Sequence, residues 1–237
     1  MVSNNFTIGV LGGMGTYATI HLFRQYARIF PAKKEWERPR IIIDNRCTMP
    51  SRVRAALYGE KREQLVNEMS DSIHNLMRAG CDRIILACNT SHLFLPDIFR
   101  QVPKAEGRVV NIIEVCMDGL SENGIQDVFL LASEATIESC IYQKSAKARG
   151  IRCKAPQKEE YTQLRNCIEA VKQNEYTEDV RRIFSELIRQ DEVCILGCSE
   201  LPILYEMYRD AFPDIDAYDP VCLALCRIKK EEAWQKS

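Results

Sequence analysis

Two cysteines stand in matching sequence settings and could carry out proton-transfer chemistry. Cys88 follows the apolar run 84–87, and Cys198 follows the related run 194–197, 110 residues further on. Each run is typical of a short buried strand. Open parallel sheets bind their ligands beyond the carboxyl ends of the strands, so both thiols are predicted at such a place. If an approximate two-fold axis relates the two segments, the thiols face each other across one cleft.

The residues after each cysteine can favour its ionised form. Asn89 and Thr90 follow Cys88, Ser199 follows Cys198, and all three are side chains that commonly open a helix. A helix N-terminus lowers the pKa of a nearby thiol and also attracts a carboxylate. We therefore expect one helix end to bind an anionic substrate and to tune a base.

Apolar residues at helical spacing precede each strand, so the chain repeats a unit of helix, turn, strand and cysteine. Strands are predicted at 6–11, 40–43, 109–113, 128–132 and 150–153 in addition to the two cysteine strands, and helices are predicted at 60–79, 159–173 and 175–190. Alternating strands and helices indicate an α/β fold with parallel sheets. We expect an N-terminal unit of residues 1–116 plus 215–237 that carries Cys88, and a second unit of residues 117–214 that carries Cys198. Turn residues Asp118 and Gly119 mark the start of the second unit, and the C-terminal amphipathic helix is expected to pack back on the first.

Composition excludes several classes of partner. The 237 residues have a formal net charge of −1, which gives no basic footprint for nucleic acid. No apolar run approaches the roughly 20 residues of a membrane span, and the opening Met1–Asn5 lacks the basic start of a signal peptide. The eleven cysteines are an odd number and are scattered, which favours reduced thiols and a cytoplasmic location.

A glycine loop offers a competing interpretation. Residues 13–18 match the pattern G-x-G-x-x-A between a predicted strand and helix, and Asp44 ends the second strand where a dinucleotide-binding fold places its ribose-binding acid. The distance from Gly15 to Asp44 exceeds the roughly 20 residues usual for that motif. The alternative is that the glycines let the backbone pass close to a ligand or to another strand.

Three motifs carry a resemblance to a known family. They are Ile8-Gly9-Val10-Leu11-Gly12-Gly13-Met14-Gly15, Ala87-Cys88-Asn89-Thr90-Ser91-His92, and Leu196-Gly197-Cys198-Ser199-Glu200-Leu201. With them the chain resembles the aspartate/glutamate racemase family, the cofactor-independent amino-acid racemases, over nearly its whole length. The resemblance implies two pseudo-symmetric Rossmann-like (flavodoxin-like) domains with the active site between them, usually in a homodimer.

Racemisation explains why two thiols are needed. One base must remove the Cα proton from one face and an acid must return a proton to the other face, so two groups on opposite walls are required. The interpretation makes Cys88 and Cys198 these catalytic residues, with a small amino acid as substrate and with no cofactor. The resemblance assigns substrate hydrogen bonds to six residues: Asn89, Thr90, Ser91, Ser133, Thr136 and Ser199. It also implies that Arg52, and less securely Lys172, bind the side-chain carboxylate of an acidic substrate.

Other residues receive plainer interpretations. The remaining nine cysteines are expected to be small core residues. Cys222 and Cys226 lie one helical turn apart, but no second pair stands at zinc-like spacing, so no metal site is expected. His92 is expected to cap or pack rather than to act as a general acid.

The side-chain pocket is where the chain departs most from the family pattern. Thr16 stands where proline is usual, Ser51 replaces an aspartate, and residues 44–47 are unusual. The substrate alternatives therefore include another small acid or a cyclic amide, as in maleate isomerases and hydantoin racemases. A dinucleotide-dependent oxidoreductase and a non-catalytic small-acid binder are the alternatives from other classes.

Overall fold

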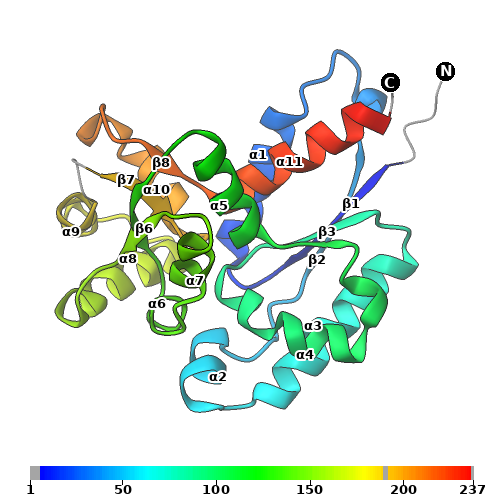
Figure 1. The fold of residues 1–237 in the computed structure, drawn as a ribbon, viewed down its shortest axis with the longest axis horizontal. Coiled ribbons are helices and arrows are strands. Elements are labelled where there is room, and N and C mark those ends of the chain that lie inside the picture. Colours follow the sequence, from blue (N-terminus) through cyan, green and yellow to red (C-terminus); the bar gives the residue numbers. More distant parts are fainter. Residues whose placement is uncertain (1–5, 189–191, 236–237) are drawn as a thin grey trace.

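Two four-stranded parallel sheets form the framework of the molecule (Figure 1). The computed structural model describes residues 6–188 and 192–235, so residues 1–5 and the end of the helix expected at 175–190 lie outside the described residues. The first sheet has the order β2-β1-β3-β4 and the second the order β6-β5-β7-β8. The strands are β1 (Thr7–Gly12), β2 (Arg40–Asn45), β3 (Arg83–Leu86), β4 (Val109–Val110), β5 (Asp127–Leu131), β6 (Arg152–Lys154), β7 (Val193–Leu196) and β8 (Ala217–Tyr218). In both sheets the first strand in the sequence lies between the second and the third, and the fourth lies at the edge beside the third. The parallel sheets confirm the expected α/β class, and this shared order confirms the expected repeat of the two halves.

Eleven α-helices in the described part of the chain connect and cover these strands. They are α1 (Thr16–Ile29), α2 (Arg52–Tyr58), α3 (Arg62–Arg78), α4 (Leu95–Gln101), α5 (Ile112–Glu122), α6 (Glu134–Glu138), α7 (Ile141–Lys147), α8 (Tyr161–Gln173), α9 (Glu178–Leu187), α10 (Leu201–Met207) and α11 (Pro220–Gln235). The segment that begins at Arg52 is the helix α2. Ser51 caps this helix, since its side chain accepts a hydrogen bond from the backbone N–H of Arg54.

The strand expected at 109–113 ends at Val110 because Asn111 begins a helix. Its side chain accepts hydrogen bonds from the N–H groups of Ile113 and Glu114. The turn expected at Asp118–Gly119 is wrong, because both residues lie inside α5. A Cβ on Gly119 would lie 3.9 Å from the side chain of Leu223, so this glycine brings α5 close to α11. The boundary expected at residue 117 thus falls within a helix.

Two apolar cores hold the first sheet between its helices. Ile84 and Leu86 point to one face, where they pack with residues of α3 and α4. Ile85, between them, points to the other face and joins a larger core that includes residues of α1, α5, α11 and the second sheet. A sheet covered on both faces explains why its strands are continuously apolar rather than alternating.

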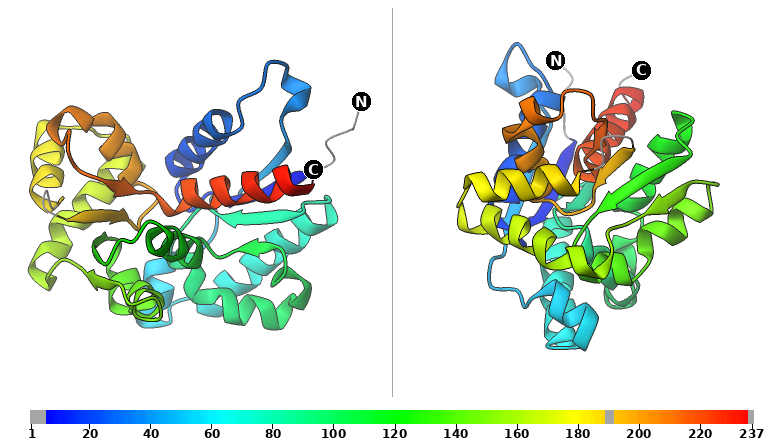
Figure 2. Two further views of the ribbon diagram at one scale, coloured as in Figure 1. Left: turned by 45° about the horizontal axis from the view of Figure 1, so that its top comes forward. Right: turned by 90° about the vertical axis from the view of Figure 1, so that its left-hand side faces the viewer.

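Each sheet ends with a strand, β4 or β8, that is followed by a helix which packs on the other half of the molecule. After β4, α5 packs against α7 and α11, on the side of the second half. After β8, a strand that pairs with β7 in the second sheet, α11 contacts α1 and β3 of the first half. Figure 2 shows α11 in red along the sheet that contains β3 (left view). The segment 215–237 therefore contributes a strand to the second sheet and a helix to the first half.

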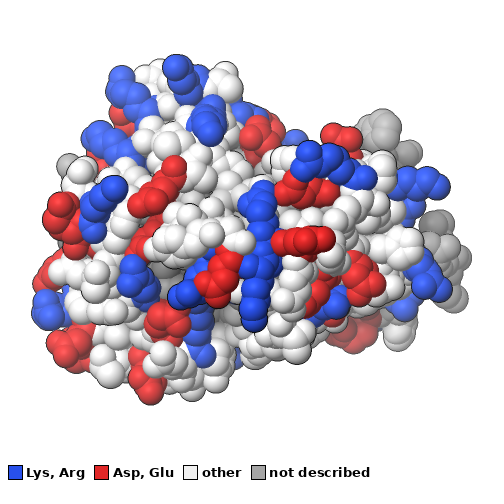
Figure 3. All heavy atoms as spheres, turned by 90° about the horizontal axis from the view of Figure 1, so that it is seen from below, with Lys and Arg blue, Asp and Glu red and all other residues white. Residues whose placement is uncertain are grey.

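The surface carries no broad area of one charge on the face drawn in Figure 3, where basic and acidic side chains alternate. The net charge of −1 agrees with this mixture. No helix in residues 6–188 and 192–235 has the length and apolar character needed to cross a membrane.

Candidate active site

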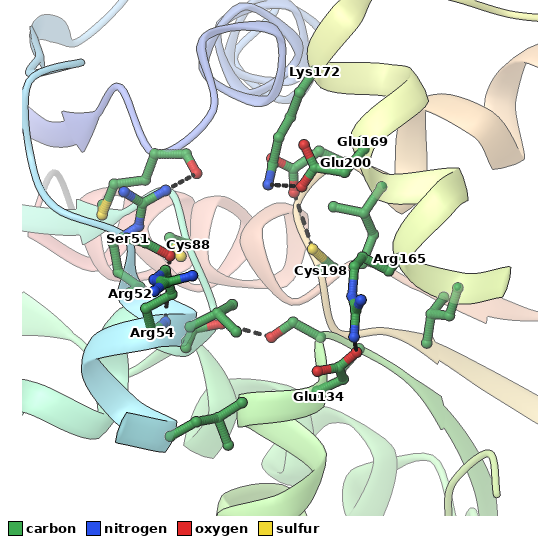
Figure 4. Close-up of a pocket in the computed structure, with 18 of the residues that line it drawn as sticks. Ser51, Arg52, Arg54, Cys88, Glu134, Arg165, Glu169, Lys172, Cys198 and Glu200 are labelled. Atoms are coloured by element: carbon green, nitrogen blue, oxygen red, sulfur yellow. Dashed lines mark hydrogen bonds and ion pairs between the residues drawn. The ribbon is translucent and has the colours of Figure 1, made fainter. Parts of the chain in front are cut away.

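Both repeat cysteines line one cavity between the two halves. The cavity has a volume of about 390 Å³ and is lined by residues of the glycine loop, α2, α6, α8 and the two strand ends. Cys88 and Cys198 approach it from opposite sides (Figure 4). The lining residues with polar or charged side chains are Ser51, Arg52, Arg54, Tyr58, Cys88, Thr90, Ser133, Glu134, Tyr161, Arg165, Glu169, Lys172, Cys198 and Glu200.

The two strand ends position the thiols in the same way. The N–H of Ala87, after β3, donates to the carbonyl of Leu11, and the N–H of Gly197, after β7, donates to the carbonyl of Leu131. Each cysteine is the next residue. A Cβ on Gly197 would lie 2.6 Å from the Leu130 side chain, so the strand end needs a glycine there.

The polar residues that follow the cysteines do not cap helices as expected. Asn89 makes no side-chain cap, and its Oδ1 instead accepts a hydrogen bond of 2.5 Å from the buried hydroxyl of Tyr142. The hydroxyl of Ser199 donates over 3.1 Å to the carbonyl of Ala87 in the other half. Both side chains join the two halves at the strand ends.

Three hydroxyls form a second link between the halves. Thr90 Oγ1 lies 2.9 Å from Ser133 Oγ and 2.9 Å from Thr136 Oγ1, and the latter two oxygens are 3.1 Å apart. Thr90 and Ser133 line the cavity, whereas Thr136 is fully buried behind them. Of the six residues expected to hydrogen-bond the substrate, only these two are among the residues that line the cavity.

Ser91 and His92 hold the backbone of Cys88. The Ser91 hydroxyl donates to the Cys88 carbonyl over 2.5 Å, and His92 Nδ1 lies 3.0 Å from the same oxygen. His92 Nε2 accepts from the N–H of Ile112 over 3.3 Å, so the neutral ring donates through Nδ1. Burial lowers the pKa of His92 to about 4. This geometry agrees with the expected packing residue and not with a general acid.

Glu200 is a site residue that the sequence analysis missed. The thiol of Cys198 donates to Glu200 Oε2 over 3.0 Å, and both groups line the cavity. Burial raises the pKa of Glu200, and burial together with the charge of Glu200 raises the pKa of Cys198. The other carboxylate oxygen, Oε1, is buried without a hydrogen-bond partner. The carboxyl group is therefore poised to exchange a proton with the thiol.

The glycine loop makes room for protein groups. Gly13 has a positive φ of 78°, and a Cβ on it would lie 2.4 Å from the backbone of Arg46. A Cβ on Gly15 would lie 2.6 Å from Glu200 Oε1. These close approaches are those expected if the glycines let other parts of the chain pass. A carboxylate already stands where the dinucleotide alternative needs a pyrophosphate, which argues against that alternative.

Several cations line the cavity. Arg52 Nη2 donates to the carbonyl of Met14 over 2.7 Å and Nη1 to that of Pro50 over 3.0 Å, while its buried Nε has no partner among the described residues. Lys172 Nζ lies 2.7 Å from Glu169 Oε1. Arg165, which the sequence analysis also missed, pairs with Glu134. Figure 4 shows Arg52 on the Cys88 side and Lys172 on the Cys198 side.

Four of the nine other cysteines, Cys81, Cys116, Cys167 and Cys194, are buried as expected, and three, Cys153, Cys222 and Cys226, are half-buried. Cys47 and Cys140 are exposed, so the expectation of a core position is wrong for these two. No group of three or more His, Cys, Asp or Glu residues within the described ranges is arranged to hold a metal ion.

Comparison with known proteins places this architecture in a family. The family model for Asp/Glu/hydantoin racemases matches residues 11–226. The chain is 25% identical to the broad specificity amino-acid racemase RacX of Bacillus subtilis over 240 residues, covering 96% of this chain and 99% of that protein. It is 28% identical to the glutamate racemase of Carboxydothermus hydrogenoformans, covering 69% of this chain and 61% of that enzyme.

A solved structure has the same fold along nearly its whole length. The aspartate racemase of Picrophilus torridus superposes with a TM-score of 0.83 at 24% identity, covering 97% of this chain and 95% of that one. The resemblance seen in the three sequence motifs is confirmed by the family match. The chain belongs to the Asp/Glu/hydantoin racemase family of isomerases.

Proposed function

We propose that this protein is a cofactor-independent racemase of acidic amino acids, aspartate and/or glutamate, with Cys88 and Cys198 as its two bases. One observation carries the proposal: the two thiols line the same cavity from different halves of the chain. The family match and the similarity to RacX support the reaction class.

The reaction needs one thiolate and one thiol. The thiolate takes the Cα proton and becomes a thiol, leaving a carbanion whose negative charge spreads onto the substrate carboxylate. The opposite thiol then gives its proton to the other face of Cα and becomes a thiolate. The product has inverted configuration and the two sulfurs have exchanged protonation states. Turnover in the reverse direction restores the starting state.

Glu200 supports the role of Cys198 in this scheme. A thiol surrounded by protein ionises reluctantly, and the hydrogen bond to Glu200 Oε2 gives its proton an acceptor 3.0 Å away. Because burial raises the pKa of Glu200, this carboxyl group binds a proton more readily than an exposed glutamate does. Glu200 thus acts as a positioning residue and a proton partner for Cys198.

Substrate contacts are assigned to residues around the two sulfurs. Arg52 and Lys172, whose side chains line the cavity, bind the side-chain carboxylate. Thr90 and Ser133 offer hydroxyls to the amino acid. The other four expected residues position the site without lining the cavity. Asn89 and Ser199 make hydrogen bonds between the two halves, Thr136 binds the hydroxyl of Thr90, and Ser91 binds the backbone carbonyl of Cys88.

Exchange of the α-hydrogen in deuterated water tests the proposal. Wild-type protein without added cofactor should introduce deuterium into aspartate or glutamate. It should also interconvert the two enantiomers, which circular dichroism measures. Cys88→Ala and Cys198→Ala should each reduce interconversion by about 10²–10⁴-fold, the contribution of one acid or base. Cys81→Ala, which removes a buried cysteine outside the cavity lining, is the control.

Several outcomes would contradict this assignment. Full activity in either alanine variant would remove that cysteine from the mechanism. Exchange confined to a hydantoin or isomerisation confined to another small acid would favour the related activities within this fold. Turnover that depends on an added dinucleotide would favour the oxidoreductase.

A homodimer in the cytoplasm completes the proposal. Family likeness supports both the dimer and the location, and the odd number of cysteines, eleven, also supports the location. Light scattering of the purified protein would show a mass twice that of the 27.2 kDa chain if the dimer forms.

A further inference from the structure

Among the described residues, each cation that lines the cavity is paired with a protein carboxylate, except Arg52. The pairs are Arg54 with Glu60, Arg165 with Glu134, and Lys172 with Glu169. Arg52 instead donates to two backbone carbonyls. A second carboxylate on the substrate therefore meets Arg52, which has no carboxylate partner among the described residues, and Lys172, which already has Glu169 beside it. At Lys172 the carboxylates of the substrate and of Glu169 compete for one ammonium.

The pair of Lys172 with Glu169 lies on the Cys198 side of the cavity. Both residues line the cavity, and the Lys172 ammonium is near enough to Glu200 and Cys198 to interact with their charges. Figure 4 shows Lys172, Glu169, Glu200 and Cys198 grouped together. Burial lowers the pKa of Lys172, but the Glu169 hydrogen bond and the Glu200 charge outweigh it and raise the pKa overall. Lys172 is therefore a charged ligand group.

Helix α8 fixes this pair geometrically. Glu169 and Lys172 are three residues apart, so their side chains lie on the same face of the helix. Leu164, Ile168 and Val171 are buried and anchor the helix against the core. Because α8 is held in this way, the backbone positions of Glu169 and Lys172 are fixed relative to each other at the edge of the cavity. The carboxylate of Glu169 competes with any ligand carboxylate for the same ammonium.

We propose that Glu169 is a specificity-determining residue, which sets the preference of the cavity between amino acids with carboxylate side chains and amino acids with neutral ones. The inference rests on the proposed function for its substrate class. By occupying Lys172, Glu169 weakens the binding of a second carboxylate and leaves the neutral amide analogue almost unaffected. The wild-type cavity then accepts neutral side chains alongside acidic ones.

Replacement of Glu169 by glutamine tests this role. Glutamine keeps the size and the helix propensity of the side chain and removes its charge. In Glu169→Gln the ratio of kcat/KM for glutamate to that for glutamine should rise by about fivefold, as expected for a partly exposed ion pair. The change should come from KM. The exposed Glu186, paired with Arg182 on α9, gives a matched control, and Glu186→Gln should leave the ratio unchanged.

A binding measurement separates this inference from the proposed function. Titration calorimetry with glutarate and with its monoamide compares two ligands that differ by one carboxylate and need no turnover. Glu169→Gln should strengthen glutarate binding relative to the monoamide, and the double variant Glu169→Gln/Lys172→Met should lose that gain. An unchanged or lower ratio in Glu169→Gln, a gain that persists without Lys172, or no binding of either ligand would overturn the role of Glu169. If no amino acid exchanges its α-hydrogen while the glutarate ratio rises, the proposed reaction fails and the role of Glu169 in carboxylate selection stands.

Discussion

The Sγ of Cys198 lies 3.0 Å from Oε2 of Glu200. The residue two positions after Cys88 is Thr90, whose hydroxyl bonds to Ser133 and Thr136. The two thiols thus occupy matching strand ends but have different neighbours. A carboxyl group is hydrogen-bonded to the thiol of Cys198, whereas Thr90, at the matching position after Cys88, belongs to a network of hydroxyls.

Glu200→Gln should slow the reaction most in the direction that uses Cys198 as the base. Glutamine can still accept a hydrogen bond from the thiol, but it cannot take the proton. We expect a loss of about 10²-fold in kcat for that direction, the lower end of a general-base contribution. Initial rates from each pure enantiomer at saturating substrate measure kcat. Because the two enantiomers are equally stable, kcat/KM must fall equally for both, and KM for the slowed direction falls with its kcat. Equal losses of kcat from both enantiomers, or none, would contradict a specific partnership with Cys198.

Gly15→Ala should disturb Glu200 without touching the substrate. The new methyl group would lie 2.6 Å from Glu200 Oε1, which forces the carboxylate to move. Overpacking of this kind typically costs about 1–3 kcal/mol of stability. We expect the same asymmetric loss of rate as in Glu200→Gln. Gly107→Ala is the control, because a Cβ there meets nothing within 4 Å.

Arg52→Lys should impair acidic substrates more than neutral ones. Lysine keeps the charge but lacks the planar fork that binds a carboxylate through two parallel bonds. An increase in KM of about tenfold for aspartate or glutamate is expected, corresponding to about 1.4 kcal/mol. A steady-state comparison with asparagine and glutamine checks the difference. Arg182→Lys on the exposed face of α9 should change neither value.

His92 should make the protein less stable as the pH falls from about 6.5 to about 4. Burial lowers the pKa of His92 to about 4 in the folded protein, whereas the unfolded chain titrates near the ordinary value of 6.5. Between these values the unfolded state binds more protons, so the free energy of unfolding rises with pH and is lost on acidification. The full difference is about 3 kcal/mol.

Urea unfolding at several pH values measures this contribution. In His92→Gln the slope of stability between pH 6.5 and 4 should be smaller than in the wild type by the histidine contribution, while other buried carboxyl groups contribute equally to both. Identical slopes would show that His92 does not stay neutral in the folded protein.

The sequence predicts the repeat well because its signal is local. Each cysteine follows an apolar run and a small residue, which is enough to predict a strand end. The role of Glu200 depends on Gly15, which is distant in the chain and touches it only in the folded protein. Ser199 likewise resembles a helix-capping residue, but its hydroxyl instead donates a hydrogen bond to the carbonyl of Ala87 in the other half of the molecule.

The sequence predicts the ends of helices and strands less well, because these ends depend on contacts between distant parts of the chain. Gly119 resembles a turn residue, yet it lies inside the helix α5, which packs against α11 through Leu223. Strand β8 is only two residues long, too short to leave a periodic pattern, and it forms because β7 offers an open edge. Such features follow from tertiary contacts, which no local pattern contains.

The packing of α5 and α11 across the two halves has a consequence for how the molecule is made. The first sheet is synthesised before α11, but Val221, Leu225 and Ile228 of α11 complete the core that includes its strand residues Ile8 and Ile85. A fragment that stops before α11 leaves this apolar surface open to water. On the ribosome, the first sheet must therefore wait until α11 has been synthesised before this surface is protected from aggregation.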